Sequence, residues 1–266
     1  MLIDCHVHLD TYSDREVSDI LDRGTSAGVH HVVSAGTTLA SSERSIELSR
    51  LFAELLSAVG IHPMDIRGPV DQSTYEELLG LARSSDKVVA ISEIGLDYIE
   101  GAPERAMQFQ AFREQIRVAR ELSLPLVFHS REAHDEVFRV LREERGYEVG
   151  GVMHYFQGDH ETAAKAIDLG FHISLARPLL RLPELQQVAA KLPLQRIVLE
   201  TDAAPQPFKA RRENWTEPRH VRDVARKVAE LQNRSVEEVE AATTANVRGL
   251  LGDRWPTVEM YVGDER

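Results

Sequence analysis

Short apolar runs alternate with longer amphipathic segments along the whole sequence. The short runs are rich in Val and Ile and are bounded by Gly, Pro or Ser, which is typical of strands. The pattern predicts eight strands, at Leu2–Val7, His31–Ser34, Leu55–Val59, Val88–Ser92, Leu126–His129, Gly151–His154, Phe171–Ser174 and Arg196–Glu200.

The amphipathic segments between these runs predict helices. In the clearest one a proline opens the segment, and Phe109, Phe112 and Ile116 recur at a spacing of three or four residues. Another segment follows Asp159, a good N-cap residue, and stops at Gly170, a typical residue just beyond a helix end. We expect helices at Ser13–Ala27, Pro103–Leu122, Arg131–Arg142 and His160–Leu169.

Strands that alternate with helices predict an α/β protein with a parallel sheet, because parallel neighbours need crossover connections. Eight strands also close a (β/α)8 barrel of the TIM type, for which about 250 residues is a usual length. Since no low-complexity linker or repeat divides the sequence, we expect a single domain over residues 1–252. We interpret residues 253–266 as a short C-terminal appendage, packed on the barrel exterior or partly disordered.

Composition narrows the class of protein further. Among 266 residues, 42% are apolar and 28% are charged, as in ordinary soluble domains. The sequence has no apolar run of transmembrane length, and its acidic start lacks the apolar stretch of a signal peptide. A single cysteine, Cys5, cannot form an internal disulfide. We therefore expect a cytoplasmic protein without a membrane partner.

The formal net charge is −12 at neutral pH. Such a charge disfavours a protein that coats nucleic acid with a uniformly basic surface. It leaves open an enzyme that binds nucleic acid at one pocket, where bound cations would add positive charge.

Imidazole and carboxylate side chains recur where the predicted strands end. A lone histidine after a strand is usually structural, and a single HxH pattern is a weak signal. The whole set is more informative, because the carboxyl ends of barrel strands form the one rim at which active sites are built. The residues in these positions are His6, His8, His62, Glu93, His129, His154 and Asp202.

These residue types predict a metal centre. Imidazole with carboxylate suits Zn, Mn, Fe or Ni, and carboxylate also accepts Mg. Alternation along the first strand turns Cys5 toward the helices, away from His6 and His8, so a closed thiolate site is disfavoured. The ligands exceed the needs of one ion, and two divalent ions that share a carboxylate and hold a nucleophilic water fit them. Asp202 is then the candidate proton acceptor, and Asp4 could orient a ligating histidine.

Several short motifs surround these residues in a fixed order. They are DCHVHLD at 4–10, GIHPMD at 60–65, SEIGLDY at 92–98, PLVFHSREA at 125–133, GGVMHYFQG at 150–158, DLGFHIS at 168–174, LETDAAP at 199–205, TEPRHV at 216–221 and TTANVRGLLG at 243–252. The ordered set covers nearly the whole chain and resembles the TatD-type metal-dependent deoxyribonucleases of the amidohydrolase-like superfamily.

The resemblance implies a TIM-like barrel that hydrolyses phosphodiester bonds in DNA, with 3′→5′ exonuclease action as one form. It also implies that Glu93 bridges two divalent ions, such as Zn, Mg or Mn, and that His62 contacts substrate phosphate. His6, His8, Glu93 and Asp202 would hold the first ion, and Glu93, His129 and His154 the second. The sequence departs from the family pattern at Ser92, at an extra alanine after the ETD motif and in the segment 209–215. None of these departures removes a predicted metal ligand. They affect what the resemblance implies about the substrate.

Basic residues near the expected rim are candidate phosphate ligands. They are Lys209, Arg211 and Arg212 after the eighth strand, and Arg131 after the fifth. A solvated basic loop explains the first three equally well. Tyr155 and Trp215 could stack on bases, although packing is the simpler interpretation. Among other histidines, alternation places His172 toward the helices.

Three functions fit the sequence. The first is a two-metal deoxyribonuclease that acts on single strands or ends of DNA. The second is a two-metal amidohydrolase or esterase that acts on a small molecule or an aminoacyl ester, because the same site attacks any polarised carbonyl or phosphoryl group. The third is a non-catalytic metal-binding scaffold, whose expected sign, a missing ligand, the sequence does not show. The oligomeric state stays open, with a monomer slightly favoured.

Overall fold

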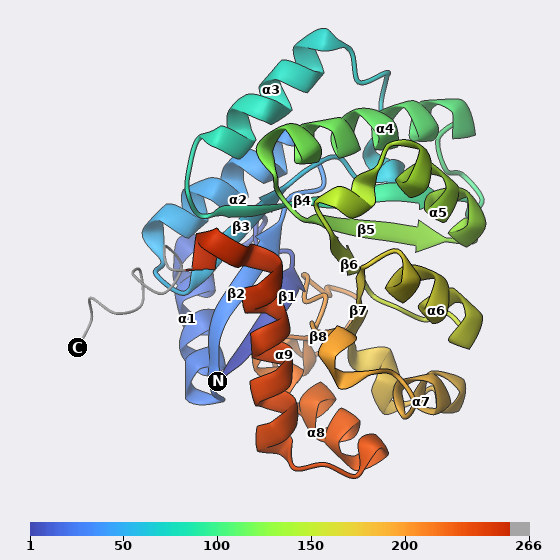
Figure 1. Cartoon of the computed structure of the whole chain (residues 1–266). Coiled ribbons are helices and arrows are strands. Elements are labelled where there is room, and N and C mark those ends of the chain that lie inside the picture. The colour runs from blue at the N-terminus through green and yellow to red at the C-terminus, as the bar shows by residue number, and fades with distance from the viewer. Residues whose placement is uncertain (256–266) are drawn as a thin grey trace.

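The computed structural model describes residues 1–255 of the chain. Its strands are parallel, follow one another around one sheet in sequence order and are surrounded by helices (Figure 1). The predicted α/β class and the (β/α)8 TIM-type barrel are confirmed. The strands are β1 (Leu2–Val7), β2 (Val29–Ala35), β3 (Leu55–Val59), β4 (Val88–Asp97), β5 (Leu126–Arg131), β6 (Gly151–Met153), β7 (His172–Leu175) and β8 (Ile197–Leu199).

Helices connect each strand to the next, and two more follow the last strand. Within the described residues the α-helices are α1 (Asp14–Ser26), α2 (Leu39–Leu51), α3 (Gln72–Arg83), α4 (Arg105–Leu122), α5 (His134–Glu143), α6 (His160–Asp168), α7 (Pro183–Ala189), α8 (Val221–Gln232) and α9 (Val236–Leu251). None of these helices is long and apolar enough to cross a membrane.

The barrel closes at the carboxyl ends of the strands, between β1 and the segment that follows β8. Val7 forms a parallel bridge with Ala203, whose carbonyl oxygen accepts the His8 N–H at 2.7 Å. The Asp202 N–H donates to the His6 carbonyl oxygen at 3.0 Å. Closure therefore joins the first and the last of the predicted metal ligands at one rim.

Strand β4 extends beyond its predicted end at Ser92. Its ladder with β5 shifts register between Ser92 and Ile94, so a bulge falls at Glu93. The strand then continues to Asp97, and all its residues are buried. The sequence pattern placed the end too early because Glu93 and Asp97 are polar residues inside a fully buried strand.

Helix boundaries follow the local capping chemistry. The Asp159 side chain accepts the Thr162 N–H at 2.8 Å at the start of α6, and Gly170 after its end has φ of +90°. The predicted start of this helix is thus confirmed, and it ends at Asp168, one residue before the predicted end. The helix predicted from Arg131 begins instead at His134, because β5 continues through Arg131.

Apolar side chains fill the barrel interior and, separately, the layer between strands and helices. Cys5 packs against the interior cluster, so the prediction that it faces the helices is wrong. The β1 ladder shifts register between Asp4 and Val7, which breaks the strict alternation on which that prediction rests. His172 is also placed wrongly by the sequence, because its neighbour Ile173 belongs to the helix-facing layer.

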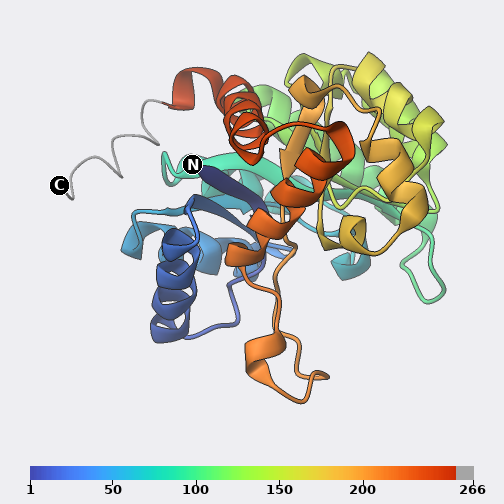
Figure 2. The same ribbon diagram turned by 90° about the horizontal axis from the view of Figure 1, so that it is seen from below.

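The end of α9 and Trp255 cover the amino-terminal end of the barrel. Val247, Leu251 and Trp255 pack against the interior cluster, and the Trp255 ring lies 5.6 Å from that of His31. The segment between β8 and α8, drawn in orange, projects on the side opposite the end of α9 (Figure 2). Residues 256–266 of the predicted appendage lie outside the described residues, and the division at residue 252 stays a prediction.

Candidate metal centre

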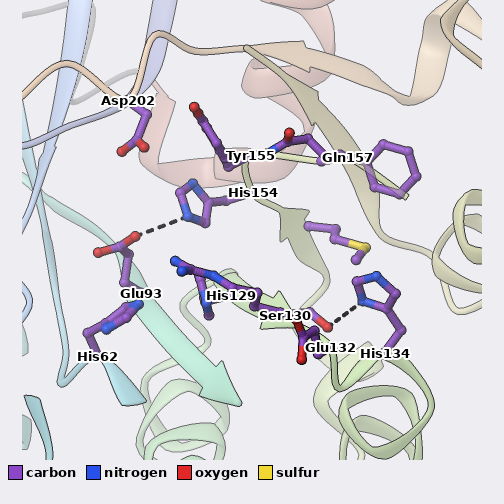
Figure 3. Close-up of a pocket in the computed structure, with 13 residues that line it drawn as sticks. His62, Glu93, His129, Ser130, Glu132, His134, His154, Tyr155, Gln157 and Asp202 are labelled. Carbon is purple, nitrogen blue, oxygen red and sulfur yellow. Dashed lines mark hydrogen bonds and ion pairs between the residues drawn. The ribbon is translucent and has the colours of Figure 1, made fainter. Parts of the chain in front are cut away.

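Six of the predicted site residues meet at the carboxyl end of the barrel. Their ligand atoms form two groups, each with all atoms within 4.8 Å of one another, and Glu93 belongs to both. Figure 3 shows the side chains of Glu93, His129, His154 and Asp202 gathered around one space. The first group is His6, His8, Glu93 and Asp202, and the second is Glu93, His129 and His154.

The Glu93 carboxylate lies between three imidazole rings. Its Oε1 is 3.4 Å from His6 Nε2 and 3.0 Å from His154 Nε2, and its Oε2 is 3.5 Å from His8 Nε2. The bulge in β4 turns this buried side chain into the centre. A carboxylate with both oxygens directed at different imidazoles has the arrangement needed to share two cations.

The histidine rings are held by partners behind them. His8 Nδ1 donates to the Ala35 carbonyl oxygen at 3.0 Å, which leaves Nε2 facing Asp202 at 3.3 Å and Glu93. His154 Nδ1 lies 3.3 Å from Glu200 Oε1, so its Nε2 is likewise free to face Glu93. Such outer contacts fix the tautomer and the direction of ligating imidazoles.

His129 is oriented in a similar way by Asp97. Its Nε2 lies 2.8 Å from Asp97 Oδ2, and its other ring nitrogen is left for a further ligand. His129, Asp97 and His62 form a third group with the geometry of a metal site. His129 therefore lies between the Glu93 group and the His62 side of the rim.

The two ring nitrogens of His6 are buried and have no hydrogen-bond partner within the described residues. Nε2 only approaches Glu93 Oε1 at 3.4 Å, and a buried imidazole that makes no hydrogen bond is costly because its polar atoms have lost their contacts with water. His6 Nε2 is one of the atoms in the first ligand group. A divalent cation at that position would satisfy it, so the residues present fit a bound metal.

Opposite charges outweigh burial in setting the protonation of the centre. Burial disfavours ionisation of Glu93, yet His8 and His6 lower its pKa well below the usual range. Burial also disfavours a charged His8, yet Glu93 and the contact with Asp202 raise its pKa to about 9. The carboxylates are therefore ionised, as metal binding requires, and binding is expected to release protons from the histidines.

Asp4 does not have its expected role. Its two carboxylate oxygens accept the Thr201 N–H at 2.9 Å and the Thr201 hydroxyl at 2.5 Å, and His6 approaches it through its backbone N–H rather than its ring. The prediction that Asp4 orients a histidine ring is wrong, because the closure between β1 and the end of β8 places Thr201 against it. Burial raises the pKa of Asp4.

Sequence reasoning missed Glu200 and Asp97 as orienting groups. Glu200 also accepts the Tyr155 N–H at 2.6 Å, so it holds the backbone that carries His154. One signal was available: each lies an even number of residues from an expected ligand, Asp202 or Glu93, at the end of the same apolar run. Even spacing places strand residues on one face.

Three residues of the rim have left-handed backbone conformations, namely Glu132 with φ of 54°, Tyr155 and Asp202. Tyr155 has φ of 47° and Asp202 has φ of 52°. Non-glycine residues in this region are held at a cost of about 1–3 kcal/mol, and such positions concentrate at functional sites. The hydrogen bonds to Glu200 and to the His6 carbonyl oxygen hold Tyr155 and Asp202 in place.

A cavity of about 510 Å³ opens beside the second group. Glu93, Asp202, His62 and Arg131 line it, together with Tyr155. The Arg131 side chain is 51% exposed and its Nε lies 3.3 Å from Asp97 Oδ2. Two of the predicted substrate-binding residues, His62 and Arg131, are thus next to the candidate metal centre.

The three basic residues after β8 lie at different places on the surface. Lys209 lines a neighbouring cavity that Asp202 also borders. Arg211 pairs with Glu213, and Arg212 pairs with Glu16 on α1 in another surface cavity.

The two aromatic side chains singled out as possible base-stacking groups also separate. Trp215 packs against the core and contacts the Tyr12 ring, as the packing interpretation predicts. Tyr155 lies between the two cavities.

Comparison with known proteins places this site in a family. Residues 3–252 match the family model described as TatD-related DNase. The chain is 35% identical to an Escherichia coli protein named uncharacterized metal-dependent hydrolase YcfH, over 94% of this chain and 95% of that protein. It is 32% identical to a Klebsiella pneumoniae protein named 3′-5′ ssDNA/RNA exonuclease TatD, over 90% of this chain and 92% of that protein.

The structure agrees with these sequence matches. The crystal structure of the TatD homologue YjjV from Escherichia coli superimposes with a TM-score of 0.84 at 28% identity, covering 94% of this chain and 97% of that one. The matched region contains all six residues of the two ligand groups. The chain therefore belongs to the TatD family of metal-dependent hydrolases.

Proposed function

We propose that the protein is a two-metal nuclease that hydrolyses phosphodiester bonds at single-stranded ends of DNA. The observation that carries this proposal is the position of Glu93 in two ligand groups that share one carboxylate. The relative named as a 3′-5′ exonuclease of ssDNA and RNA supports the substrate class and the 3′→5′ direction. Its name also adds RNA to the substrates that should be tested.

The residues of each group have separate tasks in this proposal. His6, His8, Glu93 and Asp202 hold the first ion, and Glu93, His129 and His154 hold the second. Bound divalent ions would polarise the phosphoryl oxygen and lower the pKa of water. Glu200, Asp97 and the Ala35 carbonyl orient three of the imidazoles.

Asp202 accepts the proton of the attacking water. Burial disfavours the ionised carboxylate, yet His8 lowers the pKa of Asp202 below its usual range, so the carboxylate is ionised at neutral pH. The side chain keeps 28% of its surface exposed and borders both cavities at the rim. It is the one carboxylate of the two ligand groups with this access to both cavities.

His62 binds a phosphate oxygen of the substrate. Burial and the adjacent His129 lower the pKa of His62 to about 4, so its ring is neutral at physiological pH. Nδ1 accepts the Met64 N–H at 3.1 Å, which leaves Nε2–H as a donor at the cavity. Arg131 and Lys209 add positive charge on two sides of the centre, whereas Arg211 and Arg212 would act only on a longer strand.

A second candidate function is the hydrolysis of an ester or amide in a small molecule. The cavity beside the centre has about 510 Å³, which suits a compact ligand, and Arg131 is the only arginine or lysine among its lining residues within the described chain. The net charge of −12 also disfavours long polyanions.

A substrate panel distinguishes the two functions. The protein is reconstituted with Zn, Mn or Mg and incubated with single-stranded DNA, duplex DNA, RNA, a simple carboxylic ester and an amide. We expect metal-dependent release of mononucleotides from single-stranded DNA at its 3′ end. Turnover of the ester or amide with no nucleic acid cut under any metal would overturn the nuclease proposal in favour of the second function.

A further inference from the structure

A second cavity of about 610 Å³ adjoins the candidate metal centre. Its walls come from the segment after β7, which carries Arg177 and Arg181, and from the segment after β8, which carries Phe208 and Lys209. Tyr155 and Asp202 line this cavity as well as the one that contains Glu93. A ligand that passes Asp202 can therefore occupy both cavities. We call the second cavity the basic pocket.

The charges of the basic pocket are unbalanced. Arg177, Arg181 and Lys209 line it, and Asp202 is the only carboxylate among its lining residues within the described chain. Within residues 1–255, no carboxylate oxygen lies within 4.0 Å of the charged nitrogens of these three side chains. The Lys209 ammonium donates instead to the Asn214 carbonyl oxygen at 3.0 Å.

Several other arginines of the described chain also lack a carboxylate partner, so the distinguishing feature of this pocket is that three unpaired cations line one cavity. Cations in neighbouring surface cavities are paired instead: Arg23 lies 2.9 Å from Glu217, and Arg212 pairs with Glu16. In a protein with a net charge of −12, carboxylates are abundant enough to neutralise exposed arginines. Three cations left together beside a hydrolytic centre are the electrostatic arrangement of an anion site.

An aromatic side chain lies at the same pocket. Phe208 is 81% exposed, more than any other large hydrophobic residue in the described chain. Exposed aromatic rings beside cations are the usual elements of sites that bind single-stranded nucleic acids, since bases stack on the ring while phosphates contact the cations. The ring and the cations thus match the two parts of a nucleotide.

We propose that the basic pocket binds the nucleotide next to the scissile phosphodiester. Arg177 and Arg181 contact its phosphate, Lys209 adds to the positive field, and the base stacks on Phe208. This inference rests on the proposed nuclease function and deepens it, because it makes the enzyme selective for strands over small esters. It also explains how a chain with a net charge of −12 can hold a polyanion.

The first test measures binding of a fluorescein-labelled hexathymidylate to the full chain after chelation of metals, so that no cleavage occurs. We expect the Arg177→Gln/Arg181→Gln variant to bind at least 10-fold more weakly, with the slope of log K against log salt shallower by about 0.7, because both arginines contact one phosphate. Phe208→Ala should weaken binding about 10-fold with the slope unchanged. The control Arg142→Gln, in the last turn of α5, should behave like the parent.

A second set of oligonucleotides tests the contact itself. Single phosphates of the hexathymidylate are replaced in turn by neutral methylphosphonates. In the parent, one replacement should weaken binding clearly, and the arginine variant should be insensitive to that same replacement. The pocket proposal is overturned if the parent and the arginine variant show equal affinity and equal sensitivity at every position.

Turnover by the metal-loaded protein separates this inference from the proposed function. We expect the arginine variant to raise KM for oligonucleotides while the rate on bis(p-nitrophenyl) phosphate stays unchanged. If the parent cuts DNA and the variant cuts it with the same KM, the pocket proposal fails and the nuclease function stands. If arginine-dependent binding is found but no nucleic acid is cut, the nuclease function fails and the pocket stands.

Discussion

Glu93 is a buried carboxylate with three imidazole rings around it. A buried charge is stable only when opposite charges or hydrogen bonds compensate it. In this chain the compensation comes from His6, His8 and His154, which belong to two different ligand groups. The charge of one side chain therefore links both groups.

Glu93→Gln keeps the shape of this side chain and removes its charge. We expect the variant to lose at least one of the two proposed ions on dialysis and to lower kcat by about 100-fold or more, because a neutral amide cannot share two cations. Metal analysis and steady-state kinetics measure the two effects. Glu132→Gln, at the same rim but outside every candidate metal group, should keep the metal content of the parent. Two tightly held ions in the Glu93 variant would exclude the bridging role.

Asp202→Asn addresses the proposed proton acceptor. The amide cannot accept a proton at neutral pH, so kcat should fall by about 100-fold or more while KM changes only a few-fold. Kinetics on a short oligonucleotide measure this split, with metal content checked in parallel because Asp202 belongs to the first ligand group. A kcat within a few-fold of the parent would remove Asp202 from the reaction.

At the scale of elements, the position of Glu93 depends on close contact between the end of β3 and β4. Gly60 follows β3, and an added Cβ there would lie 1.8 Å from the Ser92 carbonyl oxygen, directly before the bulge. Gln115 on α4 accepts the Ile61 N–H at 2.6 Å. The segment that leads from β3 to His62 is therefore held between β4 and α4. The position has no room for a side chain.

Gly60→Ala should therefore destabilise the fold by about 1–3 kcal/mol and displace β4 at Ser92. Urea unfolding measures the stability, and metal content reports the displacement of Glu93. Gly80→Ala is the matched control, because Gly80 is exposed on α3 with open space around it. Alanine there should raise the free energy of unfolding by up to about 1 kcal/mol. A Gly60 variant as stable as the parent would show that the contact between the strands can widen freely.

At the scale of the whole molecule, the barrel separates a catalytic rim from a structural end. The rim carries the candidate ligands, and the opposite end is covered by α9 and Trp255 against His31. His172 starts β7 at that structural end and is buried. Burial and the nearby Arg196 lower the pKa of His172 to about 4.

This lowered pKa predicts acid destabilisation of the entire barrel. Between about pH 6.5 and pH 4 the unfolded chain binds a proton at residue 172 that the folded chain does not, so the free energy of unfolding falls as the pH falls. From pH 7 to pH 5 this contribution amounts to about 2 kcal/mol. In urea unfolding, the free energy of unfolding of His172→Asn should lie below that of the parent by a smaller margin at pH 5 than at pH 7. Parallel pH profiles of parent and variant would contradict the assignment, and exposed His160→Asn serves as the control.

The sequence by itself determined the barrel and the rim on which its polar residues lie. Apolar runs mark strands whatever their neighbours are, and parallel strands share one direction, so residues at strand ends meet at one edge. For this reason the gathering of His6, Glu93 and His154 could be predicted before any distance was known. The capping residues of α6 were equally readable, because Asp159 acts on backbone only three residues away.

Contacts between distant segments were decided only by the tertiary structure. A bulge in β4 turns the Glu93 side chain into the metal centre. Barrel closure places Thr201, rather than a histidine ring, against the Asp4 carboxylate. The basic pocket joins Arg181 after β7 to Lys209 after β8, and spacing along a chain does not encode which side of a rim a loop covers. The physical reason is common to all three: strand alternation and capping act over a few residues, whereas these positions depend on register shifts and packing across the whole barrel.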